Sequence, residues 1–248
     1  MKKTFLGASI AAMLAISGCG GGGGDSGSTS SASAAQGLWL GTTSTNRTVT
    51  GLVFSDGTYY VLYSPIGNPT AIAGVVQGTG TTSASTFSSS DGRDFNLEGL
   101  GVLTGTVSAN YATKQSFNGT VAYTAGGNTS FTTTYSSAYE TAPTLANVAG
   151  TYTGQVALSV GVQSATVTVS STGAISGGGN GCSLTGTATP RTDGNAYTLS
   201  ITFGASPCFF ANQTFTGVAY YNSATKRLYG AAPNAARTDG VLFVGTKP

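Results

Sequence analysis

The sequence predicts an all-β protein built from two tandem, related antiparallel meander β-barrels of about eight strands each, after a disordered linker. The 248 residues include 38 Gly, 12 Tyr and 11 Phe, and only 7% are charged. Aromatic and β-branched residues fit pleated strands, whereas glycines mark turns. No window beyond the N-terminal region sustains an apolar period of 3.6, and landmarks recur about 113 residues apart. We therefore expect little helix and an internal duplication.

Residues 1–18 have the zones of an export signal. Lys2 and Lys3 give a positive start, and an uncharged, mostly apolar run follows over 5–16. That run is shorter than the roughly 20 apolar residues that a membrane-spanning helix needs. Ser17 and Gly18 are small, as at a secretory cleavage site. We interpret residues 1–18 as a signal peptide.

The segment Ile16-Ser17-Gly18-Cys19 resembles the lipobox of bacterial lipoprotein precursors. The resemblance implies diacylglyceryl transfer to the Cys19 sulfur and cleavage before that residue. It makes the membrane a partner through the N-terminal lipid, since two or three acyl chains anchor a protein stably. Gly20, where Asp would signal retention at the inner membrane, implies outer-membrane localisation. The alternative is an ordinary secretory signal with an incidental cysteine.

Residues 19–35 comprise the lipidated cysteine and the tether that follows it. Its Gly, Ser, Ala and Thr residues cannot bury enough apolar surface to offset the entropy of ordering. The five-glycine run lacks the Lys-Ser or Lys-Thr and the preceding strand of a phosphate loop. We place the first β-domain at 36–142 and the second at 145–248, with a joint near Pro143.

The repeat is defined by short motifs that match between the two halves. Each half opens on an aromatic residue flanked by glycines, and each contains a matching hairpin tip, a Thr-Gly pair and an Ala-Thr-Lys turn. The matching pairs are 37–41 (GLWLG) with 150–154 (GTYTG), 55–57 with 171–173, 104–105 with 216–217, and 112–114 with 224–226.

Turn signals divide each half into short strands. We expect strands in the first half at 37–43, 48–55, 58–64, 71–78, 83–88, 93–97, 101–109, 115–123 and 129–137. In the second half we expect 149–158, 163–170, 173–177, 182–189, 195–203, 213–221, 226–231 and 240–246. A meander of this size removes its edge strands by closing into a barrel. Two β-sandwiches or one larger barrel are the alternatives.

The aromatic opening, the glycine-rich meander, the lipobox and the tether together resemble the small-barrel surface lipoproteins of bacteria. Transferrin-binding and complement factor H-binding lipoproteins have this layout. The resemblance implies a tethered two-barrel architecture, and it carries over no ligand-binding residue.

Cysteine usage agrees with export. With Cys19 acylated, Cys182 and Cys208 remain in an oxidising compartment, where we expect a disulfide. The alternative, a pair of metal-binding thiolates, lacks histidine and the usual close spacing.

The residue types argue against catalysis. The absence of histidine removes the commonest general base, the Ser-His-Asp and Cys-His arrangements, and imidazole metal sites. Lys114 and Lys226 occupy matching turns. The densest acidic segment, 91–94 with Glu98, lacks the ligand spacing of a calcium loop, so we interpret it as a polar hairpin. We predict no enzyme, no catalytic residue, no metal and no cofactor.

Two adjacent tyrosine pairs are candidates for a contact surface. Successive side chains of a strand face opposite sides, so one ring of each pair must point out of a barrel. The candidates are Tyr59, Tyr60, Tyr220 and Tyr221. For Trp39 and Tyr152 we expect packing in the core.

Charge excludes one class of partner. Lys2 and Lys3 belong to the signal, so eight basic and eight acidic residues remain and no basic patch suggests nucleic acid. We expect a membrane-anchored lipoprotein with a non-enzymatic binding or structural role at the cell envelope and an unidentified protein partner. The alternatives are an integral outer-membrane β-barrel and a lipocalin-like carrier of a small apolar ligand.

Overall fold

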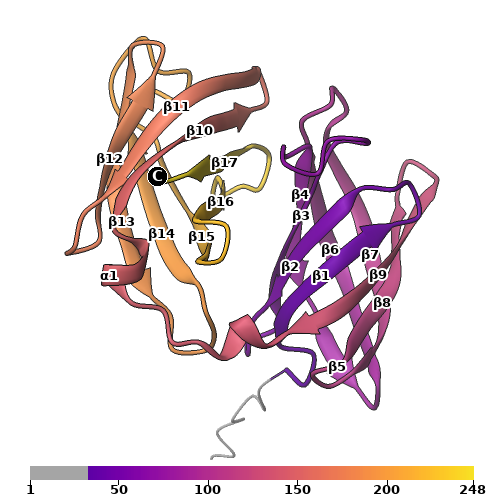
Figure 1. The fold of residues 1–248 in the computed structure, drawn as a ribbon. Helices are drawn as coiled ribbons and strands as arrows, with labels where there is room; N and C mark the ends of the chain where they lie inside the picture. Colours follow the sequence, from indigo (N-terminus) through magenta and orange to yellow (C-terminus); the bar gives the residue numbers. More distant parts are fainter. Residues whose placement is uncertain (1–32) are drawn as a thin grey trace, which may run out of the picture. The chain divides into compact units, whose positions relative to one another are not determined.

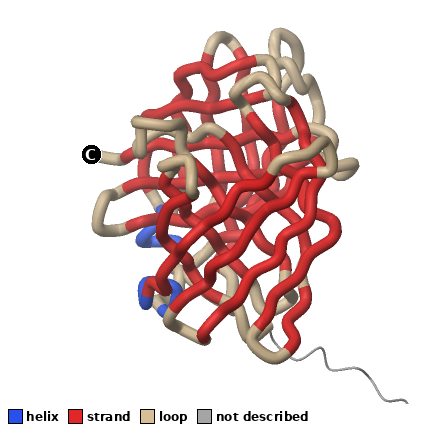
Figure 2. The backbone as a smooth tube through the Cα atoms, turned by 90° about the vertical axis from the view of Figure 1, so that its right-hand side faces the viewer, coloured by secondary structure: helices blue, strands red, loops and turns tan. Residues whose placement is uncertain are grey.

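The computed structural model describes residues 33–248, which form two closed antiparallel barrels (Figure 1). Cys19, the signal peptide and most of the tether lie outside the described residues. Figure 2 shows that strands make up most of the backbone. No helix among residues 33–248 is long and apolar enough to cross a membrane.

The first barrel is an eight-stranded meander with one additional short strand. Its sheet closes through the pairing of β4 with β6, and β1 pairs with β9. The strands are β1 (Gly37–Thr43), β2 (Thr48–Val53), β3 (Thr58–Tyr63), β4 (Gly74–Thr79), β5 (Thr81–Ser83), β6 (Thr86–Asn96), β7 (Gly101–Ala112), β8 (Ser116–Tyr123) and β9 (Asn128–Ser136). β5 forms only a hairpin with β6.

The second barrel is a simple up-and-down meander that closes by pairing of its first and last strands. Its strands are β10 (Gly150–Leu158), β11 (Gly161–Val169), β12 (Ala174–Gly179), β13 (Cys182–Pro190), β14 (Tyr197–Phe203), β15 (Thr214–Asn222), β16 (Arg227–Pro233) and β17 (Gly240–Thr246). A 3₁₀ turn, η1 (Ser137–Glu140), and a single helical turn, α1 (Leu145–Val148), connect the barrels. Thr144 caps α1 by accepting a hydrogen bond from the amide of Asn147.

The all-β, two-barrel prediction is confirmed, and one local interpretation is wrong. The acidic segment 91–94 is not a hairpin, because β6 continues through it and pairs with β7 along its length. The register shifts between Ser89 and Gly92. An extra residue at such a bulge interrupts the inward and outward alternation of side chains along a strand. The sequence of β6 therefore resembles two strands separated by a turn.

The matching motifs occupy matching places in the two barrels. Trp39 and Tyr152 are 1% and 0% exposed. The indole N–H of Trp39 donates to the carbonyl of Ala35 at 3.0 Å, and the hydroxyl of Tyr152 donates to that of Val148 at 2.7 Å. In each case the acceptor lies four residues earlier in the chain. Both aromatic side chains therefore hold the segment that leads into their barrel, as well as filling its core.

The Ala-Thr-Lys turns are also equivalent. Lys114 and Lys226 have φ angles of 55° and 53°, the left-handed conformation that a tight hairpin requires. Lys114 forms a salt bridge with Glu140 at 2.6 Å. Both lysines therefore serve as turn residues.

A separate apolar cluster joins the outer faces of the two barrels. It includes Leu52 and Tyr60 from the first barrel and Val218, Tyr220 and Leu242 from the second. Polar contacts flank it: the hydroxyl of Ser55 donates to Asp193 at 2.9 Å, and Arg237 forms a salt bridge with Asp91 at 2.9 Å. Residues that point outward from a barrel are thus buried where the barrels meet.

Candidate ligand cavity in the first barrel

The interior of the first barrel contains a cavity of about 430 Å³. Aromatic side chains cluster in one part of the barrel interior. The rings of Trp39 and Phe87 each pack on Phe117, with centroids 5.5 and 5.3 Å apart, and Phe131 packs on Phe117 at 5.6 Å. Above this cluster the inward-facing residues are mostly valines, including Val61 and Val121, and they leave space. The cavity therefore has an apolar wall and an aromatic floor.

The mouth of the cavity lies among loops at one end of the barrel. Thr45, Leu100, Ala125 and Gly126 line the cavity and are exposed to solvent. They come from the loops between β1 and β2, β6 and β7, and β8 and β9. A ligand could enter between these loops without opening the barrel wall.

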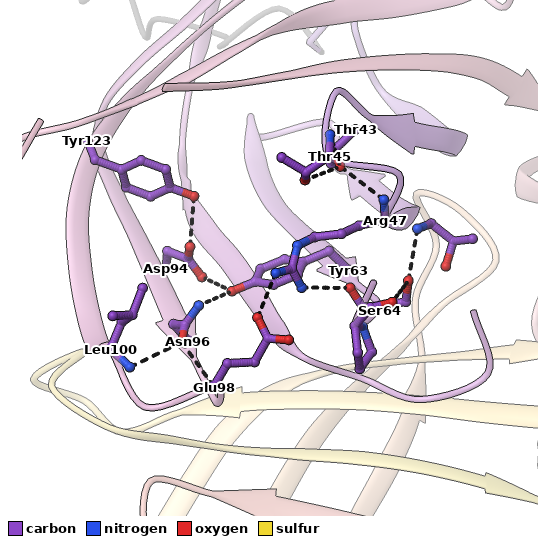
Figure 3. Close-up of polar contacts among 12 residues, drawn as sticks. Thr43, Thr45, Arg47, Tyr63, Ser64, Asp94, Asn96, Glu98, Leu100 and Tyr123 are labelled. Atoms are coloured by element: carbon purple, nitrogen blue, oxygen red, sulfur yellow. Dashed lines mark hydrogen bonds and ion pairs between the residues drawn. The ribbon is translucent and has the colours of Figure 1, made fainter. Parts of the chain in front are cut away.

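Asp94 lies inside the barrel near this mouth, between two tyrosines (Figure 3). The hydroxyl of Tyr63 donates to its Oδ1 at 2.7 Å, and the hydroxyl of Tyr123 donates to its Oδ2 at 2.9 Å. Asp94 is only 3% exposed. Burial raises the pKa of Asp94, and the two tyrosine hydrogen bonds oppose that rise. Burial, together with the nearby Asp94 carboxylate, also raises the pKa of both tyrosines, which stay neutral donors.

A second layer of polar contacts surrounds this centre. The side-chain amide of Asn96 donates to the Tyr63 hydroxyl at 3.2 Å. Arg47 forms a salt bridge with Glu98 at 2.7 Å and donates to the carbonyl of Ser64 at 3.0 Å. The Arg47 guanidinium lies 5.5 Å from the centre of the Tyr63 ring. Its hydrogen bond to Glu98 raises the pKa of Arg47, so this cation is already paired.

The acidic residues that are close in sequence are separated in space. Asp91 pairs with Arg237, Asp94 with the two tyrosines, and Glu98 with Arg47. Asp91 also accepts a hydrogen bond from the amide of Thr79 at 2.9 Å. Each carboxylate therefore has its own set of partners, and only Asp94 is directed into the barrel.

The second barrel is filled where the first is hollow. The cavity lined by its core residues measures about 60 Å³. In the first barrel, Gly105 of β7 is paired with Gly92 of β6. In the second barrel, Gly217 of β15 is paired with Leu199 of β14. Because Gly105 and Gly217 match between the two halves, Leu199 corresponds to Gly92. Two and four residues further on, Ile201 and Phe203 therefore occupy the positions of Asp94 and Asn96. The second barrel thus has apolar side chains where the first barrel has Asp94 and Asn96.

A loop completes the filling of the second barrel. Phe210, between β14 and β15, packs against Phe203 and Phe215 with ring centroids 5.7 and 4.7 Å apart. The predicted disulfide is present: Cys208 in this loop is bonded to Cys182 at the start of β13, with Cα atoms 4.6 Å apart. The disulfide ties the plugging loop to the barrel wall.

The four tyrosines proposed as a contact surface are all buried. Tyr59 and Tyr221 point into their own barrels, where they belong to the internal cores. Tyr60 and Tyr220 point outward and lie in the cluster between the barrels, and Tyr220 stacks on Tyr229 with centroids 6.1 Å apart. The outward rings therefore contact the neighbouring barrel.

The cavity residues were not singled out from the sequence as a site. A signal existed: Gly92, Asp94 and Asn96 alternate with outward residues and share the inner face of β6. The bulge after Ser89 shifts the alternation, so the phase of β6 could not be read from the residues before it. Tyr63 meets Asp94 only because β4 pairs with β6 and closes the barrel, whereas Tyr123 reaches Asp94 from β8 across β7.

No protein-family model and no curated protein sequence matches this chain. Among solved structures, the chain is similar to transferrin-binding protein B from serogroup B Neisseria meningitidis, with 11% identity and a TM-score of 0.29 over 81% of this chain. It is also similar to a variant of transferrin-binding protein B from Haemophilus parasuis Hp5, with 9% identity and a TM-score of 0.27 over 82% of this chain. The chain spans 66% of the length of each of these structures, just under two thirds. Transferrin-binding protein B is one of the families named above from the layout of the sequence.

Proposed function

We propose that this chain is an envelope lipoprotein, anchored through Cys19, whose first barrel binds a small and largely apolar ligand. The observation that carries the proposal is the difference between the barrels: about 430 Å³ of interior space in the first and about 60 Å³ in the second. Ligand sites in proteins commonly measure about 300–1,000 Å³ and combine apolar walls with a few convergent polar groups. The role is binding, without catalysis.

The mixed lining of the cavity supports this role. A barrel of eight strands has room for packed side chains or for one small ligand, and the second barrel demonstrates the packed solution with the same layout of strands. In the first barrel, Val61 and Val121 remain partly accessible although they face inward. Their accessibility comes from the cavity that they line.

The outer faces of several strands support a tethered protein over an integral barrel. Membrane barrels present an outward apolar band about 25 Å tall. The outward residues of β7 and β9 are instead mostly exposed hydroxyl and amide side chains, namely Thr104, Thr106, Ser108, Asn110, Asn128, Ser130, Thr132 and Thr134. Such faces suit contact with water, and anchoring then falls to the lipid on Cys19.

The test is binding of a neutral fluorescent probe, N-phenyl-1-naphthylamine, to the full chain carrying Cys19→Ser, so that neither acyl chain nor detergent competes. We expect saturable binding with one site. Val121→Trp, which fills the cavity, should weaken binding by about tenfold or more, a loss of at least ~1.4 kcal/mol. Its melting temperature should stay close to that of the parent.

A matched variant in the second barrel serves as the control. Ala219→Trp adds the same ring to a filled core, where overpacking costs about 1–3 kcal/mol of stability, and it should leave probe binding unchanged. Saturable binding that survives Val121→Trp undiminished would place the probe elsewhere and contradict the proposal.

A further inference from the structure

The Asp94 carboxylate forms no salt bridge with a cationic side chain in the described part of the chain. Residues 33–248 contain four salt bridges, and Asp94 takes part in none of them. Arg47, the cation among the residues that line the cavity, is directed at Glu98 and at a backbone carbonyl. Burying an unpaired carboxylate costs free energy, and buried charges are therefore normally paired. Two tyrosine hydrogen bonds reduce this cost without neutralising the charge.

The polar end of the cavity offers hydrogen-bond acceptors to a ligand, whereas its hydrogen-bond donors already bond to other side chains of the protein. An ionised carboxylate has about four lone-pair sites, and Tyr63 and Tyr123 occupy one on each oxygen of Asp94. Both hydroxyl protons are directed at Asp94, so these tyrosines cannot also donate to a ligand. Asn96 donates to the Tyr63 hydroxyl. A head group complementary to this end must donate hydrogen bonds.

The remainder of the cavity accepts an apolar body. Below Asp94 the lining consists of Val61, Val107, Val121 and the rings of the floor. An amphiphile with its head at Asp94 would place its apolar part against these side chains.

From this arrangement we propose that the first barrel binds a cationic amphiphile, whose protonated amine pairs with Asp94 while its apolar chain fills the cavity. This inference rests on the proposed function and names the ligand class of the same site. A carboxylate head is disfavoured because it would meet the like charge of Asp94, with Glu98 holding Arg47. A neutral alcohol would make a hydrogen bond without gaining the ion pair.

The experiment compares three amphiphiles of equal chain length, dodecylamine, dodecanol and dodecanoate, as competitors of the neutral probe at neutral pH, on the full chain with Cys19→Ser. We expect dodecylamine to bind about tenfold or more tightly than dodecanol, because charge-assisted hydrogen bonds exceed neutral ones. Dodecanoate should bind most weakly. Asp94→Asn should bring dodecylamine to the level of dodecanol while dodecanol is unchanged.

The matched control is Asp56→Asn. Asp56 is exposed at the turn between β2 and β3, where it accepts a hydrogen bond from the amide of Thr58 at 2.8 Å. This variant removes the same charge outside the cavity, so the preference for the amine should persist.

Two negative results are distinguishable. Probe binding with no preference for dodecylamine, or a preference that survives Asp94→Asn, overturns the cationic ligand and leaves the cavity as a binding site. Failure of the probe and of all three amphiphiles to bind removes the proposed function and this inference together.

Discussion

Tyr63 reaches Asp94 across an intervening strand, and the hydroxyl of Tyr63 donates to the carboxylate at 2.7 Å. Tyr63 is on β3 and Asp94 is on β6, while β4 lies between them in the sheet. The ring passes over Gly74 of β4, where a Cβ atom would collide with the tyrosine ring and hydroxyl. Gly74 is therefore part of the site although it carries no functional group.

The same arrangement occurs a second time between these strands, four residues earlier on β3. Tyr59 of β3 is paired with Gly78 of β4, and its hydroxyl forms a hydrogen bond with Ser89 of β6 at 3.0 Å. A Cβ atom at Gly78 would approach the Tyr59 hydroxyl too closely. Burial raises the pKa of Tyr59 to about 12, so it stays protonated at neutral pH. Two tyrosines thus bridge β3 and β6 over glycines.

Replacing Gly74 tests this relationship. Gly74→Ala should displace Tyr63 from Asp94, costing about 1–3 kcal/mol of stability through overpacking and weakening the preference for an amine. Urea unfolding and the amphiphile competition measure the two effects. Gly51→Ala is the control, because a Cβ at Gly51 meets no atom closer than 3.5 Å. Equal behaviour of the two variants would contradict the crossing of Tyr63 over Gly74.

The buried carboxyl predicts an unusual dependence of stability on pH. Burial raises the pKa of Asp94 above its ordinary value of 3.8, with Tyr63, Tyr123 and Arg47 opposing the rise and Glu98 adding to it. Above that ordinary value the folded protein holds the proton more tightly than the unfolded chain, so stability falls as the pH rises through the folded-state pKa. The free energy of unfolding, relative to Asp94→Asn, should therefore decrease as the pH rises from about 4.

Urea titrations of both proteins across the pH range measure this difference. Hydrogen bonds and ion pairing lower the pKa values of Asp193 and Glu140, so these groups give the opposite slope. Their contributions cancel between the parent and the variant. A relative stability that increases with pH would show that Asp94 is stabilised in its charged form.

The proposed anchoring depends on a single residue. Cys19→Ser removes the sulfur proposed to carry the lipid, and we expect the exported protein to move from the membrane fraction to the soluble fraction. Fractionation after a carbonate wash measures this, with Ser26→Ala in the tether as the control that stays membrane-bound. Carbonate-resistant association of the Cys19→Ser protein would favour an integral barrel.

The disulfide should stabilise the second barrel alone. Replacing Cys182 and Cys208 together by Ser removes a loop closure of 26 residues, which the chain-entropy model values at about 3.5 kcal/mol. We expect a lower unfolding midpoint with probe binding retained, because the cavity belongs to the first barrel. Loss of probe binding under conditions where the chain is still folded would show that the plugging loop affects the first barrel.

Local patterns in the sequence were sufficient for much of the fold. Glycine and turn signals placed most strands within a few residues, and the recurrence of Trp39 at Tyr152 and of Lys114 at Lys226 revealed the duplication. These features depend on backbone preferences of neighbouring residues, so they can be read along the chain. The cysteine count similarly predicted the bond between Cys182 and Cys208, since only two thiols remained to pair.

Residues distant in sequence become a site only in the folded barrel. Tyr63 meets Asp94 because β4 pairs with β6, and Tyr123 meets it from β8 across β7. The alternation of each strand turns these side chains inward. Volume is likewise a tertiary property: two halves with matching strands differ in whether their interiors are filled, which depends on how side chains from eight strands pack together. The sequence was enough to predict two barrels, and the anchor at Cys19 stays a prediction from the sequence. Packing alone determined which barrel contains a cavity and which carboxylate faces it.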